Sequence, residues 1–95
     1  MIGCYILFSV KLDKFYIGAT QEDIEVRIIK HNLKLYGNHR FTAQADNWEL
    51  FLFIPTNDYS MAIRIERKIK SMKSSKYIEN LKKYPELLEK LVSSI

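Results

Sequence analysis

The sequence predicts a small α/β (α+β) fold in which helices pack on an antiparallel or mixed sheet, in the order ββαβαα(α). Two short apolar runs, separated by the turn-like "KLDK", indicate a β-hairpin near the N-terminus. Two longer stretches carry apolar residues at helical spacing, and a third apolar run lies between them. A hairpin at the start favours an antiparallel or mixed sheet over a doubly wound one. With 95 residues, we expect a single domain spanning 1–95.

The first half of the chain supplies two strands and a helix. Residues 4–10 and 14–18 are rich in the β-branched and aromatic residues that favour strands, and Gly18 is expected to end the second strand. A helix is predicted from about 21 to 35, because acidic residues fill its first turn and a glycine follows its last. Thr20 is the candidate N-cap of this helix.

The second half supplies a third strand and further helices. The run "WELFLFIP" (48–55) is predicted to be a strand that its proline stops. A long helix is expected from about 58 to 74, followed by shorter helices at 76–83 and from Pro85 onward. The polar segment 38–47 is predicted to be a loop, and its length suggests a function.

Charge and cysteine content narrow the setting and the partners. The net charge of +4 suits a polyanionic partner such as nucleic acid, although many small soluble domains are this basic. Cys4 is the single cysteine, so we expect no internal disulfide, no cysteine-based zinc site and a reducing intracellular compartment, cytoplasm or nucleus. The apolar first ten residues are too short to span a bilayer and lack the features of a signal peptide, so no membrane partner is expected.

Two basic side chains on the first predicted helix form a candidate site. Arg27 and His31 are four residues apart, so both emerge on one face, at the margin of an apolar stripe formed by Ile24, Ile28 and Leu35. An arginine fork matches the geometry of phosphate, and a neighbouring cation favours a neutral histidine that can accept a proton. The alternative is a solvated arginine and a histidine at the edge of the core.

The second long helix carries a carboxylate beside its buried stripe. Glu66 lies four residues after Ala62 and three before Ile69, where a charge must find a cation. That cation is a side chain such as Arg67, or a hard metal such as Mg²⁺, which is often held by one or two carboxylates with water and substrate phosphate. The alternative is a simple ion pair with Lys70 one turn further on.

Two tyrosines lie in the predicted hairpin. Tyr5 and Tyr16 occupy adjacent strands and are candidates for a cross-strand pair on one face. Such pairs usually reflect packing, and six tyrosines in the chain make coincidence easy. The sequence contains no P-loop, dinucleotide-binding or H-E-x-x-H motif.

Together these residues resemble the signature of the GIY-YIG nuclease superfamily. "GCY" at 3–5 is similar to its first motif, and "YIG" at 16–18 matches its second in full. "DIEVRIIKHN" resembles the family helix that carries an arginine and, four residues on, a histidine or tyrosine. "RFT" at 40–42 is similar to the basic-aromatic-threonine loop of the small standalone branch, and "AIRIERKIK" resembles the helix with the metal-binding glutamate. The resemblance covers 3–73, whereas the helices in 76–95 have no clear counterpart.

The resemblance implies a three-stranded antiparallel sheet and an endonuclease that hydrolyses phosphodiester bonds with one divalent ion, Mg²⁺ or Mn²⁺. The branch is similar to the catalytic domain of structure-specific DNA-repair nucleases, which implies a DNA substrate and structure-selective or weakly specific cleavage. Glu66 would bind the metal, and Arg27 would hold the scissile phosphate. The residues that would surround the attacking water are Tyr5, Tyr16 and His31. Of these, Tyr5 is the first candidate for the general base and His31 the second.

Further residues are candidates for contact with the DNA backbone, which would be independent of sequence and sensitive to salt. Gly18 is expected to let the chain leave its strand close to the substrate. Asn80 is a candidate for the late asparagine found in family members. The candidates for backbone contact are His39, Arg40, Thr42, Arg64, Lys68, Lys70 and Lys73.

A catalytically silent module that binds DNA or a protein is the alternative function. The first predicted helix motivates it, because Val26, Ile29, Leu33 and Tyr36 form a second apolar face. We expect the C-terminal "LLEKLVSSI" to cover this face, or else a targeting protein partner or a second copy in a homodimer.

Overall fold

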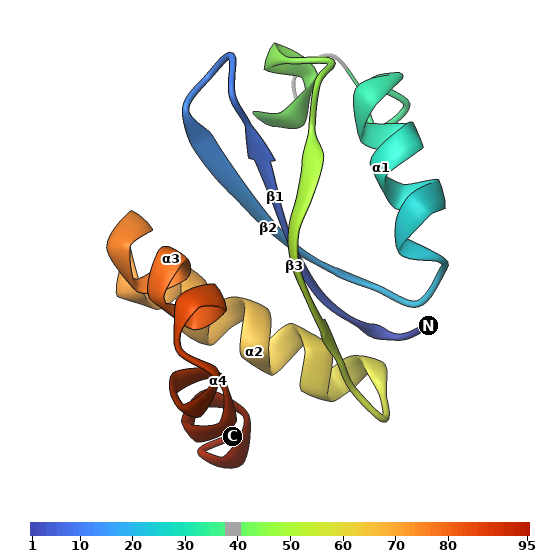
Figure 1. Ribbon diagram of the computed structural model, residues 1–95. Coiled ribbons are helices and arrows are strands. Elements are labelled where there is room, and N and C mark those ends of the chain that lie inside the picture. The colour runs from blue at the N-terminus through green and yellow to red at the C-terminus, as the bar shows by residue number, and fades with distance from the viewer. Residues whose placement is uncertain (38–40) are drawn as a thin grey trace.

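A three-stranded antiparallel sheet lies at the centre of the computed structural model, which describes residues 1–37 and 41–95. Figure 1 shows helix α1 (Ile24–Asn32) on one side of the sheet, and α2 (Tyr59–Met72), α3 (Ser75–Lys83) and α4 (Pro85–Ser93) on the other. The architecture confirms the predicted fold class and the order ββαβαα(α). The strands, in the spatial order β2-β1-β3, are β1 (Gly3–Ser9), β2 (Lys14–Thr20) and β3 (Glu49–Pro55). The helices are α1 (Ile24–Asn32), the 3₁₀ helix η1 (Phe41–Gln44), α2 (Tyr59–Met72), α3 (Ser75–Lys83) and α4 (Pro85–Ser93).

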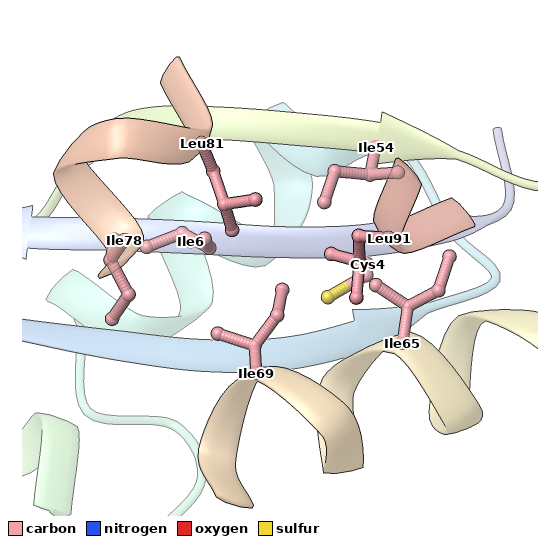
Figure 2. Close-up of a cluster of buried hydrophobic side chains, with 8 residues drawn as sticks. All are labelled: Cys4, Ile6, Ile54, Ile65, Ile69, Ile78, Leu81 and Leu91. Carbon is pink, nitrogen blue, oxygen red and sulfur yellow. The ribbon is translucent and has the colours of Figure 1, made fainter. Parts of the chain in front are cut away.

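The central strand β1 is buried on both faces, because alternate side chains of a strand point to opposite sides of the sheet. Tyr5 and Leu7 face α1 and pack with Trp48, while Cys4 and Ile6 face α2, α3 and α4. Burial raises the pKa of the Cys4 thiol to about 12, so this cysteine is a protonated part of the core. Figure 2 shows the larger core, formed by Cys4, Ile6, Ile54, Ile65, Ile69, Ile78, Leu81 and Leu91.

Helix α1 is shorter than predicted at both ends. Its N-cap is Asp23, whose carboxylate accepts a hydrogen bond from a backbone N–H two residues on, so the assignment of Thr20 is wrong. Thr20 instead ends β2. At the other end Lys34 adopts a left-handed backbone with φ of 59°, which stops the helical periodicity. Leu35 is therefore 64% exposed and does not face the sheet.

The C-terminal helices pack on the face of the sheet opposite α1. Leu91 of α4 is 4% exposed and lies in the core with Cys4. The prediction that the C-terminal segment covers the second face of α1 is therefore wrong. On that face Val26, Ile29 and Leu33 are 41%, 56% and 63% exposed.

Candidate active site

Four predicted residues meet on the sheet face that α1 covers. Tyr5 and Tyr16 lie on this face from adjacent strands, as predicted, with ring centroids 6.3 Å apart. Arg27 and His31 reach the same place from successive turns of α1. The i, i+4 spacing on the helix and the strand alternation thus bring residues far apart in the sequence to one cluster.

The hydroxyl of Tyr5 lies between Arg27 and His31. Arg27 Nη2 donates to this hydroxyl at 3.0 Å, and His31 Nε2 lies 2.8 Å from it. Nδ1 on the other side of the ring lies 2.9 Å from Thr42 Oγ1, so both nitrogens of His31 have a hydroxyl partner. When the Tyr5 hydroxyl donates to Nε2, the neutral histidine carries its proton on Nδ1 and donates to Thr42. The two contacts together fix the orientation of the ring.

Burial sets the protonation states of the cluster. Burial and then the charge of Arg27 lower the pKa of His31 to about 4. Burial also raises the pKa of Tyr5, although the hydrogen bond from Arg27 opposes that shift. Burial works against the charge of Arg27 too, but the hydrogen bond to Tyr5 leaves its pKa raised. At neutral pH the cluster therefore holds a charged arginine beside a neutral histidine and a neutral tyrosine.

A cavity of about 460 Å³ opens beside this cluster. Tyr5 is fully buried and is not among the lining residues. Within the described ranges, Arg27 Nε and the Tyr36 hydroxyl are buried without a hydrogen-bond partner. Unpaired polar groups of this kind, next to a cation, suit an anionic ligand such as phosphate. The cavity is lined by Tyr16, Arg27, His31, Tyr36, Phe41, Thr42 and Lys70.

Gly18 makes room for Tyr5 on the neighbouring strand. The two residues are directly opposite each other, and a Cβ at position 18 would lie 2.5 Å from Tyr5 Cζ and 2.6 Å from its hydroxyl oxygen. The strand continues to Thr20, so the prediction that Gly18 ends it is wrong. Gly18 was expected to let the chain leave its strand close to the substrate. In the structure its role is instead to leave space for the ring of Tyr5.

Glu66 forms an ion pair with Lys70, which was the alternative to a metal ion in the sequence analysis. Its Oε2 lies 3.4 Å from Lys70 Nζ, one turn further along α2. Lys70 also lines the cavity, so it connects Glu66 to the site. In the part of the chain that the structure describes, no three His, Cys, Asp or Glu side chains gather as a metal site. A single carboxylate still fits a hard divalent ion whose other ligands are water and substrate oxygens.

The basic candidate residues on α2 and at its C-cap lie on two sides of the buried stripe of this helix. Lys70 lines the cavity, and Lys73 borders a neighbouring surface pocket that Lys70 shares. Arg64 instead lines a pocket with Val92 of α4. At 100° per residue, Lys68 lies on the same side of α2 as Arg64. The structure therefore places Lys70 at the cavity and Lys73 at the adjoining pocket, whereas Arg64 and, by helical geometry, Lys68 lie on the other side of α2.

The remaining candidates have different positions. Thr42 is 2% exposed and holds His31, so it orients the histidine and is too buried for the expected contact with a DNA backbone. Asn80 lies on α3, in the layer on the other face of the sheet. His39 and Arg40 lie outside the described residues.

Three residues of the site were missed by sequence reasoning. Trp48 Nε1 donates to the Thr42 carbonyl at 2.8 Å, which holds η1 in place. The Asn32 side chain both donates to and accepts from the Trp48 backbone. The ring of Tyr36 lies 4.8 Å from the Arg27 guanidinium carbon, in a cation–π contact. The only signal in the sequence was the position of Asn32 directly after His31, a candidate site residue.

Comparisons with known proteins bear on the whole arrangement. The family model described as the GIY-YIG catalytic domain matches residues 1–80, which include the clustered residues and all of α2. Neither the curated proteins nor the solved structures gave a match.

Proposed function

Because the chain belongs to the GIY-YIG nuclease superfamily, we propose that it is a DNA endonuclease that hydrolyses phosphodiester bonds with one divalent ion, Mg²⁺ or Mn²⁺. The observation that carries this proposal is the chain of contacts from Arg27 through Tyr5 to His31, at the wall of a cavity. Hydrolysis of a phosphodiester needs a fixed cation for the phosphate and an unprotonated group near the water. Both occur here side by side.

Arg27 holds the scissile phosphate in this proposal. Its Nη2 is occupied by Tyr5, while Nε has no partner among the described residues. The hydrogen bond from Arg27 to Tyr5 and the Tyr36 ring against its guanidinium keep the side chain in position before substrate arrives. Preorganised charge of this kind stabilises the negative charge that develops on the phosphate without further rearrangement.

Tyr16 and His31 are assigned to the attacking water, since both line the cavity. Tyr5 is assigned to holding Arg27 and His31, because it is fully buried and its raised pKa keeps the hydroxyl protonated. His31 is the proton acceptor, since its lowered pKa leaves it neutral at pH 7. Proton uptake at Nε2 requires the Tyr5 hydroxyl to release that nitrogen or to pass its own proton to it.

Glu66 is the residue that would hold the divalent ion. When bound, such an ion neutralises negative charge on the phosphate oxygens. Lys70 pairs with this carboxylate and also faces the cavity, so it is placed to turn from Glu66 towards substrate. Binding of Mn²⁺, followed by electron paramagnetic resonance, should be lost in Glu66→Gln and retained in Glu89→Gln, an exposed α4 residue.

A cleavage assay tests the function. The full chain is incubated with duplex, single-stranded, flap and junction DNA in Mg²⁺ or Mn²⁺, beside the variants Arg27→Lys and Glu66→Gln and the control Glu89→Gln. We expect cutting by the wild type and the control and loss in both site variants. Wild-type cutting by Glu66→Gln would overturn the site assignment. Failure of the wild type to cut any of these DNAs with either metal would overturn the function.

A catalytically silent binding module is the second candidate. It is favoured by the ion pair that already occupies Glu66 and by the exposed apolar face of α1. DNA binding without metal-dependent cutting would support it. A targeting protein or a second copy on the α1 face stays a prediction, which size measurement of the full chain tests.

Among the helices that the structure describes, none is long and apolar enough to cross a bilayer.

A further inference from the structure

Phe41 is a partly exposed aromatic residue at the cavity. It begins η1, is 36% exposed and lines the same cavity as Arg27. Its ring is nearly parallel to that of Tyr16, with 14° between the planes and centroids 6.4 Å apart. Lys14 Nζ lies 5.8 Å from its centroid. An exposed aromatic ring beside a cation, at a cavity with further positive charge, is the kind of arrangement with which proteins bind single-stranded nucleic acid.

The lining of the cavity combines two kinds of group. Tyr16, Tyr36 and Phe41 supply aromatic surface, and Arg27 and Lys70 supply positive charge. The positive charges are sufficient to bind a phosphate. The aromatic surface therefore indicates that the same ligand also carries a flat chemical group, which stacks on it. A paired duplex keeps its bases stacked inside, whereas an unpaired nucleotide offers a base and a phosphate together. The volume of about 460 Å³ falls in the range of pockets that enclose small ligands.

The ring of Phe41 is connected to the rest of the site through its neighbour in η1. Thr42 orients His31 through its hydroxyl, and Trp48 holds the Thr42 carbonyl. A base stacked on Phe41 would therefore contact η1, the short helix whose Thr42 positions His31, the proton acceptor.

We infer that Phe41 is a platform on which an unpaired base of the substrate stacks. The site then takes DNA with a single-stranded or splayed-out nucleotide next to the scissile phosphate in preference to a continuous duplex. This inference rests on the proposed function for the phosphate at Arg27, but base stacking itself does not depend on cleavage.

Binding without metal tests the inference. The probes are a single-stranded oligonucleotide that contains 2-aminopurine and the same sequence as a duplex, both in EDTA. The variants are Phe41→Leu, Phe41→Tyr and the control Tyr84→Leu. Tyr84 is a matched control, since it is 42% exposed and has Lys83 Nζ 5.4 Å from its ring, but it follows α3 in the layer opposite α1. Circular dichroism checks that each variant is folded.

We expect Phe41→Leu to weaken single-strand binding by about 5- to 150-fold, the range for loss of one stacked base, with duplex binding little changed. It should also remove the change in 2-aminopurine fluorescence that wild-type binding produces, while Phe41→Tyr and Tyr84→Leu behave as the wild type. Equal loss on both DNAs, no loss in Phe41→Leu, or wild-type preference for duplex would overturn the inference. Stacking without any cutting by the wild type would leave the inference standing and remove the endonuclease. Cutting by the wild type, together with a Phe41→Leu variant that keeps the single-strand preference, would remove the inference and leave the endonuclease standing.

Discussion

Replacing Gly18 by alanine should disturb the site through a single contact. The added methyl would lie 2.5 Å from Tyr5 Cζ, at least about 1 Å inside the ~3.5–4.0 Å of ordinary carbon contact. Gly18 has no positive φ, so alanine is compatible with its backbone and the effect is steric. Tyr5 is fully buried and its hydroxyl is bonded on two sides, so the ring has no free space to move into.

The magnitude follows from two opposing contributions. Overpacking of a buried ring costs about 1–3 kcal/mol, and removing a glycine from a strand returns about 0.5–1 kcal/mol. The expected net loss in the free energy of unfolding is about 0–2.5 kcal/mol, centred near 1 kcal/mol. At that centre the melting temperature of a domain of this size should fall by about 4–8 °C. Single-turnover cleavage should also slow, because the displaced hydroxyl no longer fixes Arg27 and His31.

A double-mutant cycle with Tyr5→Leu isolates the contact. Leucine lacks Cζ, Cε1 and the hydroxyl oxygen, which are the three atoms that the new methyl would meet. In that background Gly18→Ala should be stabilising by about 0.5–1 kcal/mol, so the sign of its effect reverses. Urea unfolding followed by far-ultraviolet circular dichroism measures all four proteins. The same loss in both backgrounds would refute the steric argument.

Two further predictions concern His31. Its pKa of about 4 in the folded state lies below the ordinary 6.5, so the unfolded chain binds more protons between these values. The free energy of unfolding should therefore fall as the pH drops from about 6.5 to about 4, by on the order of 3 kcal/mol from this group. His31→Gln should remove this part of the pH dependence of the free energy of unfolding, as measured by urea titrations at several pH values. An unchanged pH dependence would contradict the lowered pKa of His31. Thr42→Val removes the hydrogen-bond partner of Nδ1 and should cost about 1–3 kcal/mol and slow cleavage about 10- to 100-fold, with recovery in Thr42→Ser. Wild-type cleavage by Thr42→Val across pH 5–9 would show that the histidine does not need to be held by Thr42.

The sequence predicted those parts of the site that depend on local periodicity. Arg27 and His31 share a helix face, and Tyr5 and Tyr16 share a sheet face, because spacing alone decides both. The contact between Gly18 and Tyr5 depends on the strand register, which no local pattern reports. The C-terminal end of α1 was misjudged for a related reason, since Lys34 adopts a left-handed backbone three residues before Gly37, the glycine that was expected to follow the helix.

Long-range packing accounts for the other differences. The hydrogen bonds that join Asn32, Trp48 and Thr42 link segments up to sixteen residues apart, through backbone groups that every residue has. Two apolar surfaces were available to the C-terminal helices, namely the second face of α1 and the sheet face that carries Cys4 and Ile6. The helices pack on the sheet face. Helical spacing shows that a face must be covered but does not show by which segment.

The double burial of β1 limits how this protein can change over evolutionary time. Tyr5 and Leu7 belong to the site, while Cys4 and Ile6, their neighbours in the strand, belong to the opposite core. Inserting or deleting one residue would exchange the two sets, and would put a tyrosine hydroxyl among aliphatic side chains. Substitution is therefore the tolerated route of change in this strand, and variation in length must be accommodated in the turns. A lineage can adjust the chemistry of the site only one side chain at a time here.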